Sequence, residues 1–506
     1  MTKGYRVVAL TVSTALFMQF LDSTALNVAI PAMARDLHVP AIDLNIAILA
    51  YQLSMTVLIP VGSVLVERVG QRNAFAIALL VFMVGSILCA ISTSLPALVA
   101  SRALQGAGGA VMTPVSRLLV VRSADKSELL NAMNWLLLPG IVGPMMGPVI
   151  GGQLVTYSSW HWIFLINVPV ALLGIVMTLI IVPDVRDSAK GNVDIKGIML
   201  VGPAIFALVF GLESAAHPGA AWKALCLLVA AAVLFWLFIR HVRTAASPVL
   251  DLTLLSVASF RHSIVSGSIY RTLAMANGFI MPLWLQLGMG MSAAKAGAIL
   301  VVSSIGTIAS RLAGVHITRM IHPRTVAIGG AVLLVFALLA TSRLETDWPL
   351  PVFYSLLGFQ AIVLSLSMMV VSASAYVDIE AERVAQAAGL FTTIQQVTMS
   401  LGVTLGVWLI SGMRLFYGTS EHDSRIYSAS LVILALIAVA GLVIICASLT
   451  TSGLVVWHHH DVAQQKQRSA EFATAAAIAA TKLEDLLGNK GVPCTFNQFS
   501  ITNPNA

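Results

Sequence analysis

Long apolar runs separated by short polar loops fill the chain from about residue 5 to residue 450. An α-helix that crosses a membrane needs about 20 mostly apolar residues, with a range of about 17–25. By that measure the pattern predicts fourteen spans, at residues 7–30, 44–66, 74–93, 95–121, 131–154, 160–182, 196–214, 222–240, 262–287, 293–318, 325–342, 349–374, 388–413 and 428–449. We therefore expect an all-α polytopic membrane protein.

The composition agrees with this expectation. Hydrophobic residues make up 58% of the 506 residues and charged residues only 10%, whereas a soluble domain carries about 25% charged residues. This excludes a soluble enzyme. The net charge of +7 is interpreted as the excess of Lys and Arg that marks the cytoplasmic loops of membrane proteins. Nucleic acid is not an expected partner, because no basic patch has interleaved aromatic residues.

The basic residues also predict an orientation. If both termini are cytoplasmic, the loops on that side hold sixteen Lys and Arg and the opposite loops hold six, a bias that favours cytoplasmic termini. The predicted organisation is a six-helix half at residues 1–182, a linker with two helices at 183–261, a second six-helix half at 262–452 and a polar, Ala-rich cytoplasmic tail at 453–506.

The residue types that bind metals or perform catalysis form no recognisable pattern in the sequence. The four cysteines show neither CxxC nor His/Cys ligand spacing, so no metal, cofactor or disulfide framework is expected. The sequence also lacks the motifs HExxH, GxSxG and GxxxxGK[ST]. We therefore expect neither an enzyme nor an ATP-driven pump, which leaves an ion gradient as the energy source.

One carboxylate, Asp22, lies in the middle of the first apolar run, within FLDSTALNVAIP. A charge at the centre of a bilayer costs at least about 2.5–3.5 kcal/mol. Asp22 must therefore face water, a cation or a partner inside the protein, or hold a proton. Two roles stay open: a proton carrier whose environment alternates during transport, and a lock held by hydrogen bonds to neighbouring spans.

A second charge, Arg102, lies inside the fourth predicted span in LVASRALQGAGGA. Gln105 follows one turn later on the same helix face. An arginine at that depth must pair with another group or lie in a water-filled cavity. The alternative is that its guanidinium reaches the nearby helix end by snorkelling.

Two further motifs concern helix movement. In PGIVGPMMGPVIGGQ, glycines at four-residue spacing allow another helix to approach closely, and the prolines bend the helix. This combination favours a hinge-like fifth span over a generic packing face; the residues are Gly143, Pro144, Gly147, Pro148, Gly151 and Gly152. The loop SVLVERVGQRN joins the second and third spans, and its candidate latch residues are Glu67, Arg68, Gly70 and Arg72.

Together these motifs resemble the major facilitator superfamily, and within it the 14-helix drug:proton antiporter branch (EmrB/QacA-like), over about residues 5–450. The matching segments are LDSTALNVAIP, LVASRALQGAGGA, GPMMGPVIGG and WHWIFLINVP. The loop between the second and third spans departs from the family pattern at Ser63 and Glu67, which puts the tuning of the latch in question. Within the branch, the pattern is most similar to MdtD- and HsrA-like members.

The resemblance implies two pseudo-symmetric six-helix halves that rock around a central site, with two inserted helices. It implies export of lipophilic, often cationic, drugs across the bacterial inner membrane, coupled to inward proton flow. The implied partners are a small-molecule substrate, protons and the lipid bilayer. A periplasmic adaptor and an outer-membrane channel are candidate partners, and the protein is expected to be a monomer.

Arg271 is not explained by the general family pattern. It lies in the span at 262–287, the counterpart of the first span, and our hypothesis is that Asp22 and Arg271 face a central cavity and pair in one state. An arginine in the cavity also repels cationic drugs. An exporter of an anionic or zwitterionic metabolite or siderophore therefore stays open, as does a transporter-like sensor without flux.

Several uncharged residues within the spans are candidates for the cavity wall, although polar residues also bridge helices. Glu213, at the end of its span, is expected to snorkel to the interface. The candidates for the cavity are Asn27, Gln105, Asn277, Gln286, Gln395, Gln396 and Met399.

Overall fold

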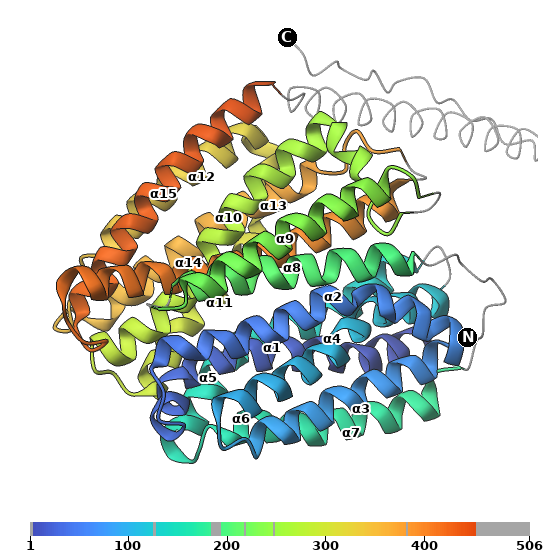
Figure 1. Cartoon of the computed structure of the whole chain (residues 1–506), viewed down its shortest axis with the longest axis horizontal. Helices are drawn as coiled ribbons and strands as arrows, with labels where there is room; N and C mark the ends of the chain where they lie inside the picture. Colours follow the sequence, from blue (N-terminus) through green and yellow to red (C-terminus); the bar gives the residue numbers. More distant parts are fainter. Residues whose placement is uncertain are drawn as a thin grey trace, which may run out of the picture. The chain divides into compact units, whose positions relative to one another are not determined.

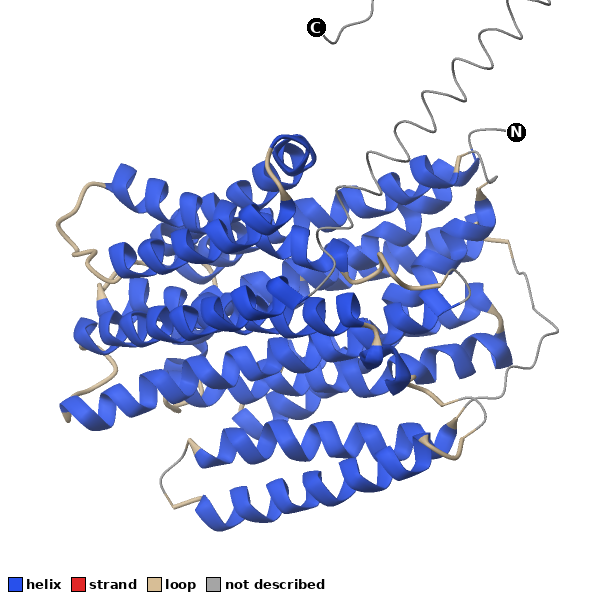
Figure 2. Ribbon diagram, turned by 90° about the horizontal axis from the view of Figure 1, so that it is seen from above, coloured by secondary structure: helices blue, strands red, loops and turns tan. Residues whose placement is uncertain are grey.

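The computed structural model describes residues 4–124, 128–183, 194–216, 219–245, 248–380 and 383–451. Helices make up most of these ranges, and no β-strand occurs in them (Figure 1, Figure 2). The predicted tail at 453–506 lies outside the described residues. The expected all-α architecture is confirmed.

The first half of the fold contains helices α1 to α7, and their bounds follow the hydropathy pattern. Helices α6 and α7 together form one apolar segment, His161–Ile181, where the sequence predicted a single span. The elements are α1 Gly4–Asp36, η1 Ala41–Leu44, α2 Asn45–Val69, α3 Gln71–Ala90, α4 Leu95–Ser123, α5 Leu129–Tyr157, α6 His161–Leu165 and α7 Asn167–Ile181.

The remaining elements comprise an inserted pair and a second half. The pair is α8 and α9, and the second half runs from α10 to α15 with a short π-helical turn, η3, after α10. The bounds are α8 Ile195–Ala215, α9 Ala221–Val242, η2 Leu252–Ser256, α10 Ala258–Leu283, η3 Trp284–Gly288, α11 Ala293–Met320, α12 Pro323–Thr341, α13 Leu350–Ser374, α14 Val384–Tyr417 and α15 Ser424–Thr451.

Local sequence explains where several helices begin. The Asp194 side chain accepts a hydrogen bond from the Gly197 N–H at 2.8 Å and caps α8. Ser292 caps α11 in the same way. Such caps satisfy N–H groups that have no partner within the helix. Gly70 has a φ of 82°, a conformation that favours glycine, and so allows α3 to start directly after α2.

Eleven segments in the described ranges are long and apolar enough to cross a membrane. The long helices α4, α5 and α10 are not among them. A membrane protein with many spans is thus confirmed, and the number of fourteen spans stays a prediction.

The two halves repeat one packing pattern. In the first half α1 packs on α5, α2 and α3 pack on α4, and α3 packs on α7. In the second half α10 packs on α14, α11 and α12 pack on α13, and α12 packs on α15. The halves meet where α5 contacts α11 and where α14 contacts α2 (Figure 1). This repetition is the pseudo-symmetry expected of the fold.

The inserted helices α8 and α9 pack on each other, and α8 also contacts α2 and α14. Glu213, near the end of α8, is only 1% exposed and accepts a hydrogen bond from the Asn45 amide at 2.7 Å. The prediction of a snorkelling acid was therefore wrong. A buried carboxylate requires hydrogen-bond donors, and α2 supplies one here.

Candidate functional site

Asp22 lies at the centre of a buried polar network inside the first half. Its Oδ2 accepts a hydrogen bond from the Arg102 guanidinium at 2.5 Å. Its Oδ1 accepts from the Gln105 amide at 3.0 Å and from the Asn167 amide at 3.1 Å. Helices α1, α4 and α7 are thus joined around one carboxylate, which is 0% exposed.

Arg102 is enclosed as completely as its partner. It is 1% exposed, and its guanidinium carbon lies 4.3 Å from the centre of the Tyr51 ring, a cation–π geometry. Gln105 links the pair to α3, because it also donates to the Ser86 hydroxyl at 2.9 Å. The prediction that Arg102 must pair is confirmed, and the snorkelling alternative is wrong.

Three members of this network were not identified as candidates from the sequence: Tyr51, Ser86 and Asn167. Asn167 lies in the segment WHWIFLINVP, which was noted only as a family motif. Its amide, in a motif that is mostly apolar, was the feature of the sequence that could have identified Asn167 as a candidate. Ser86 and Tyr51 lie in ordinary apolar helices, and nothing in the sequence distinguishes them.

The structure does not bring Asp22 and Arg271 together. Asp22 points into the first half, where its hydrogen-bond partners are Arg102, Gln105 and Asn167. Arg271 belongs to the second half and donates to the Ser372 hydroxyl. The hypothesis that the two residues pair in another state stays a prediction.

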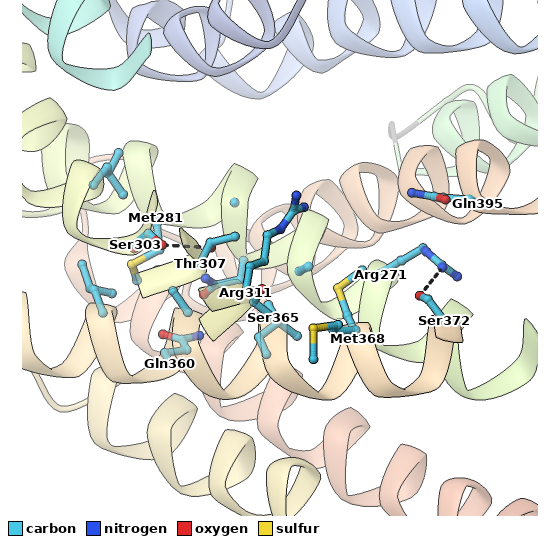
Figure 3. Close-up of a pocket in the computed structure, with 18 of the residues that line it drawn as sticks. Arg271, Met281, Ser303, Thr307, Arg311, Gln360, Ser365, Met368, Ser372 and Gln395 are labelled. Carbon is cyan, nitrogen blue, oxygen red and sulfur yellow. Dashed lines mark hydrogen bonds between the residues drawn. The ribbon is translucent and has the colours of Figure 1, made fainter. Parts of the chain in front are cut away.

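A cavity of about 710 Å³ lies in the second half, between α10, α11, α13 and α14 (Figure 3). Its lining mixes cationic, amide, hydroxyl and thioether groups. The labelled residues are Arg271, Met281, Ser303, Thr307, Arg311, Gln360, Ser365, Met368, Ser372 and Gln395. The described lining residues include two arginines and no Asp or Glu.

Arg271 contributes a buried cation to this cavity. It is 3% exposed, it donates to the Ser372 hydroxyl at 3.1 Å, and its guanidinium carbon lies 4.6 Å from the centre of the Phe391 ring. Its Nε and the Asn277 Oδ1 are buried without a hydrogen-bond partner in the described part of the chain. The cavity wall therefore offers a hydrogen-bond donor and an acceptor that no described protein group satisfies.

The other predicted cavity residues divide into groups. Asn277 and Gln395 line the cavity, whereas Gln105 belongs to the Asp22 network. Gln286 donates to the Val28 carbonyl at 2.9 Å and so joins the two halves. Half-buried residues outside the cavity lining are Asn27, Gln396 and Met399.

The glycines of α5 produce close helix contacts. A Cβ at Gly151 would lie 2.9 Å from the Cα of Ala25 in α1, and Gly143 approaches α1 similarly. Gly147 also approaches α1 at Thr24. Gly152 faces the opposite half, where a Cβ would lie 2.5 Å from a carbonyl oxygen of α11. Close packing is thus established, and bending at Pro144 and Pro148, which lie within α5, stays a prediction.

The loop between α2 and α3 contains the predicted latch. Gly70 forms the turn, and Arg68 is exposed. Arg72 lies in the first turn of α3. The Glu67 side chain lies outside the described residues. A latch function for this loop stays a prediction.

Five hydrogen bonds join described residues of the two halves. All lie between the middle of the helices and the end at which α1 terminates. The pairs are Gln286 with Val28 (2.9 Å), Ala294 with Thr156 (2.9 Å), Ser304 with Pro144 (2.9 Å), Ser400 with Gln52 (3.2 Å) and Ala41 with Glu421 (3.2 Å). Hydrogen bonds therefore connect the two halves from the middle of the helices to the end at which α1 terminates.

Known proteins share the sequence pattern. A family model described as "Major Facilitator Superfamily" matches residues 12–403, and one described as "Uncharacterized protein Rv1363c/MT1408-like" matches residues 433–491. The chain is 29% identical over 444 residues to "Probable transport protein HsrA" of Haemophilus influenzae, covering 87% of this chain and 95% of that protein. It is 32% identical over 428 residues to "Putative multidrug resistance protein MdtD" of Serratia proteamaculans, covering 82% and 88%.

Solved structures share the fold. The nucleoside transporter NupG aligns with a TM-score of 0.59 at 14% identity, covering 88% of this chain and 100% of that chain. An inward-facing bacterial homologue of the lysosomal transporter Spinster aligns with a TM-score of 0.58 at 14% identity, covering 88% and 96%. With the family match over most of its length, the chain belongs to the major facilitator superfamily of membrane transporters.

Proposed function

We propose that the protein is a proton-coupled exporter that moves amphipathic small molecules across the bacterial inner membrane by alternating access. The observation that carries this proposal is the cavity of about 710 Å³ within a fold of two similarly packed halves. Its size falls in the range of about 300–1,000 Å³ that suits drug-sized ligands. The relatives named as multidrug resistance proteins support the same class of substrate.

The position of the hydrogen bonds between the halves supports alternating access. The hydrogen bonds between the halves gather toward the end where α1 terminates, which the charge bias predicts to be the outer side. The structure then corresponds to a state closed to the outside. Export requires these contacts to break while the opposite end closes, as rocking of two halves around a fixed site demands.

Proton coupling is assigned to the Asp22 network. In the structure Asp22 is locked by three side chains, which favours the lock over a freely accessible carrier. Protonating Asp22 would remove the charge that compensates Arg102, and a buried arginine without a partner is costly. The network can therefore couple protonation to rearrangement of α1 against α4. Pairing of Asp22 with Arg271 would additionally require Asp22 to leave its three partners in the first half, so it is not part of this proposal.

The proposal is tested by a drug and metabolite susceptibility screen in an efflux-deficient host. The wild type should confer resistance to at least one compound, and a protonophore should abolish it. Asp22→Asn should lose the resistance at equal membrane abundance, whereas Gly389→Ala should retain it, because a Cβ at Gly389 meets open space. Equal susceptibility of wild type and empty vector across the screen would reject export, and resistance that survives the protonophore would reject proton coupling.

A further inference from the structure

We infer that the cavity in the second half selects amphipathic organic anions, with Arg271 and Arg311 binding the acidic group and the sulfur-rich wall holding the apolar body. This inference rests on the proposed function, because it names the substrate class of the same cavity. It reverses the cationic preference expected from the family resemblance.

The first argument is the electrostatic state of Arg271. It is almost fully buried, and within the described residues no carboxylate lies within 4.0 Å of it. Its neighbours are a hydroxyl and an aromatic ring, and its Nε donor has no acceptor there. Buried charges in membrane proteins are normally paired or mark a substrate pathway. An anion entering the cavity would provide the acceptor that the protein does not.

The second argument is a second arginine facing the same space. Arg311 comes from α11, whereas Arg271 comes from α10, and both line the cavity. Figure 3 shows the Arg311 side chain extending into the open part of the cavity. Arg311 is exposed, so its guanidinium is available to a ligand. Guanidinium groups form paired hydrogen bonds with carboxylates, sulfonates or phosphates.

The remaining lining describes the rest of the ligand. Met281, Met368 and Met369 contribute flexible, polarizable side chains, and Phe391 contributes an aromatic face. Methionine adapts to irregular apolar ligands. With no Asp or Glu among the described lining residues, a lipophilic cation would meet two like charges and no opposite one. Like-charge contacts of this kind discriminate strongly against a ligand.

The test uses the full chain in lipid nanodiscs and two probes that share one apolar body. Dansylglycine is an anion and dansylcadaverine is a cation. The wild type should bind dansylglycine at least about tenfold more tightly than dansylcadaverine, because only the anion accepts charge-assisted hydrogen bonds from the two arginines. Arg271→Gln and Arg311→Gln should each weaken dansylglycine binding about tenfold or more, and Arg271→Lys should weaken it less. Arg343→Gln, at an exposed position outside the cavity, is the matched charge control and should change nothing.

The inference is overturned if the wild type binds the cation as tightly as the anion, or if Arg311→Gln, at an exposed position, leaves anion binding unchanged. These outcomes are separate from failure of the proposed function. Selective anion binding without any export in the susceptibility screen would reject transport and keep the anion site. Proton-dependent export of cations only, with no dansylglycine binding, would keep transport and reject the anion site.

Discussion

Among the described residues, each half of this transporter buries one arginine, and the two arginines have different surroundings. Arg102 in the first half is paired with Asp22 at 2.5 Å and stacked on an aromatic ring. Arg271 in the second half faces a hydroxyl, an aromatic ring and the cavity. The helix packing of the halves is similar, so the difference comes from side chains and not from the backbone.

This contrast separates structural charge from charge available to a ligand. A paired buried charge holds helices together and is destabilising when one partner is removed, because the other remains buried. A charge without an internal partner weakens the fold and is retained only where another requirement exists. A pseudo-symmetric fold can thus place its lock in one half and its ligand-binding charge in the other.

The largest expected effect is a difference in stability between variants of the two buried arginines. Arg102→Gln leaves the Asp22 carboxylate buried without its cation and should cost about 3–5 kcal/mol of stability. Arg271→Gln removes a charge with no carboxylate partner among the described residues, so the stability should stay equal or rise. Thermal unfolding of both variants in one detergent measures this. Equal losses for the two would remove the contrast between the halves.

The next largest effect on stability concerns the hydrogen bonds that join α8 to each half. Asn45 of the first half donates to the buried Glu213 carboxylate at 2.7 Å, and Trp408 of the second half donates to the Leu212 carbonyl at 2.9 Å. Asn45→Ala should cost about 1–3 kcal/mol, because it removes a donor from a buried acceptor, and Trp408→Phe about 0.5–1.5 kcal/mol, because its hydrogen bond lies at an exposed position. Unfolding midpoints of the two variants provide the comparison, and the reverse order would contradict it.

A third prediction moves from the halves to the surface between them. A Cβ at Gly152 or Gly297 would meet a carbonyl oxygen of the opposite half, whereas a Cβ at Gly389 would meet open space. Alanine at either of the first two positions should therefore penalise the present state by about 1–3 kcal/mol and populate the alternative one.

Spin labels at the exposed positions 157 and 422 allow the distance between the two halves at this end to be measured by double electron–electron resonance spectroscopy. The distance distribution should lengthen for Gly152→Ala and Gly297→Ala and stay unchanged for Gly389→Ala. A wild-type distribution in all three variants would show that this contact does not control the closed end.

The smallest effect is local and depends on pH. Burial raises the pKa of Asp194, but hydrogen bonds from the Gly197 N–H and from His241 at 2.7 Å lower it more, so the net shift is downward. A lowered native pKa stabilises the fold above the unfolded value of about 3.9 and loses this contribution as the pH falls. Asp194→Ala should cost about 1 kcal/mol at neutral pH.

The difference in melting temperature between wild type and Asp194→Ala should accordingly be full at neutral pH and shrink below about pH 4. Thermal unfolding at a series of pH values measures it. A difference that grows on acidification would contradict the sign of the pKa shift.

The sequence predicted helices better than it predicted partners, for a physical reason. Helix position depends on local hydropathy, so the predicted first span at 7–30 lies wholly within α1, Gly4–Asp36. The partner of a buried charge depends on helix rotation, and a shift of two residues changes the face by about 200°. The need of Asp22 for a partner was therefore predictable, but the choice of Arg102 over Arg271 was not.

The end of α8 has a consequence for how the transporter can open. Leu212 and Glu213 are consecutive residues, and they hold α14 of one half and α2 of the other through Trp408 and Asn45. Any separation of α2 from α14 at this level must stretch two bonds in series through a single peptide unit. The bond from Trp408 to the Leu212 carbonyl is the weaker of the two, so it is expected to break first. The inserted pair α8 and α9 then moves with the first half when the two halves separate.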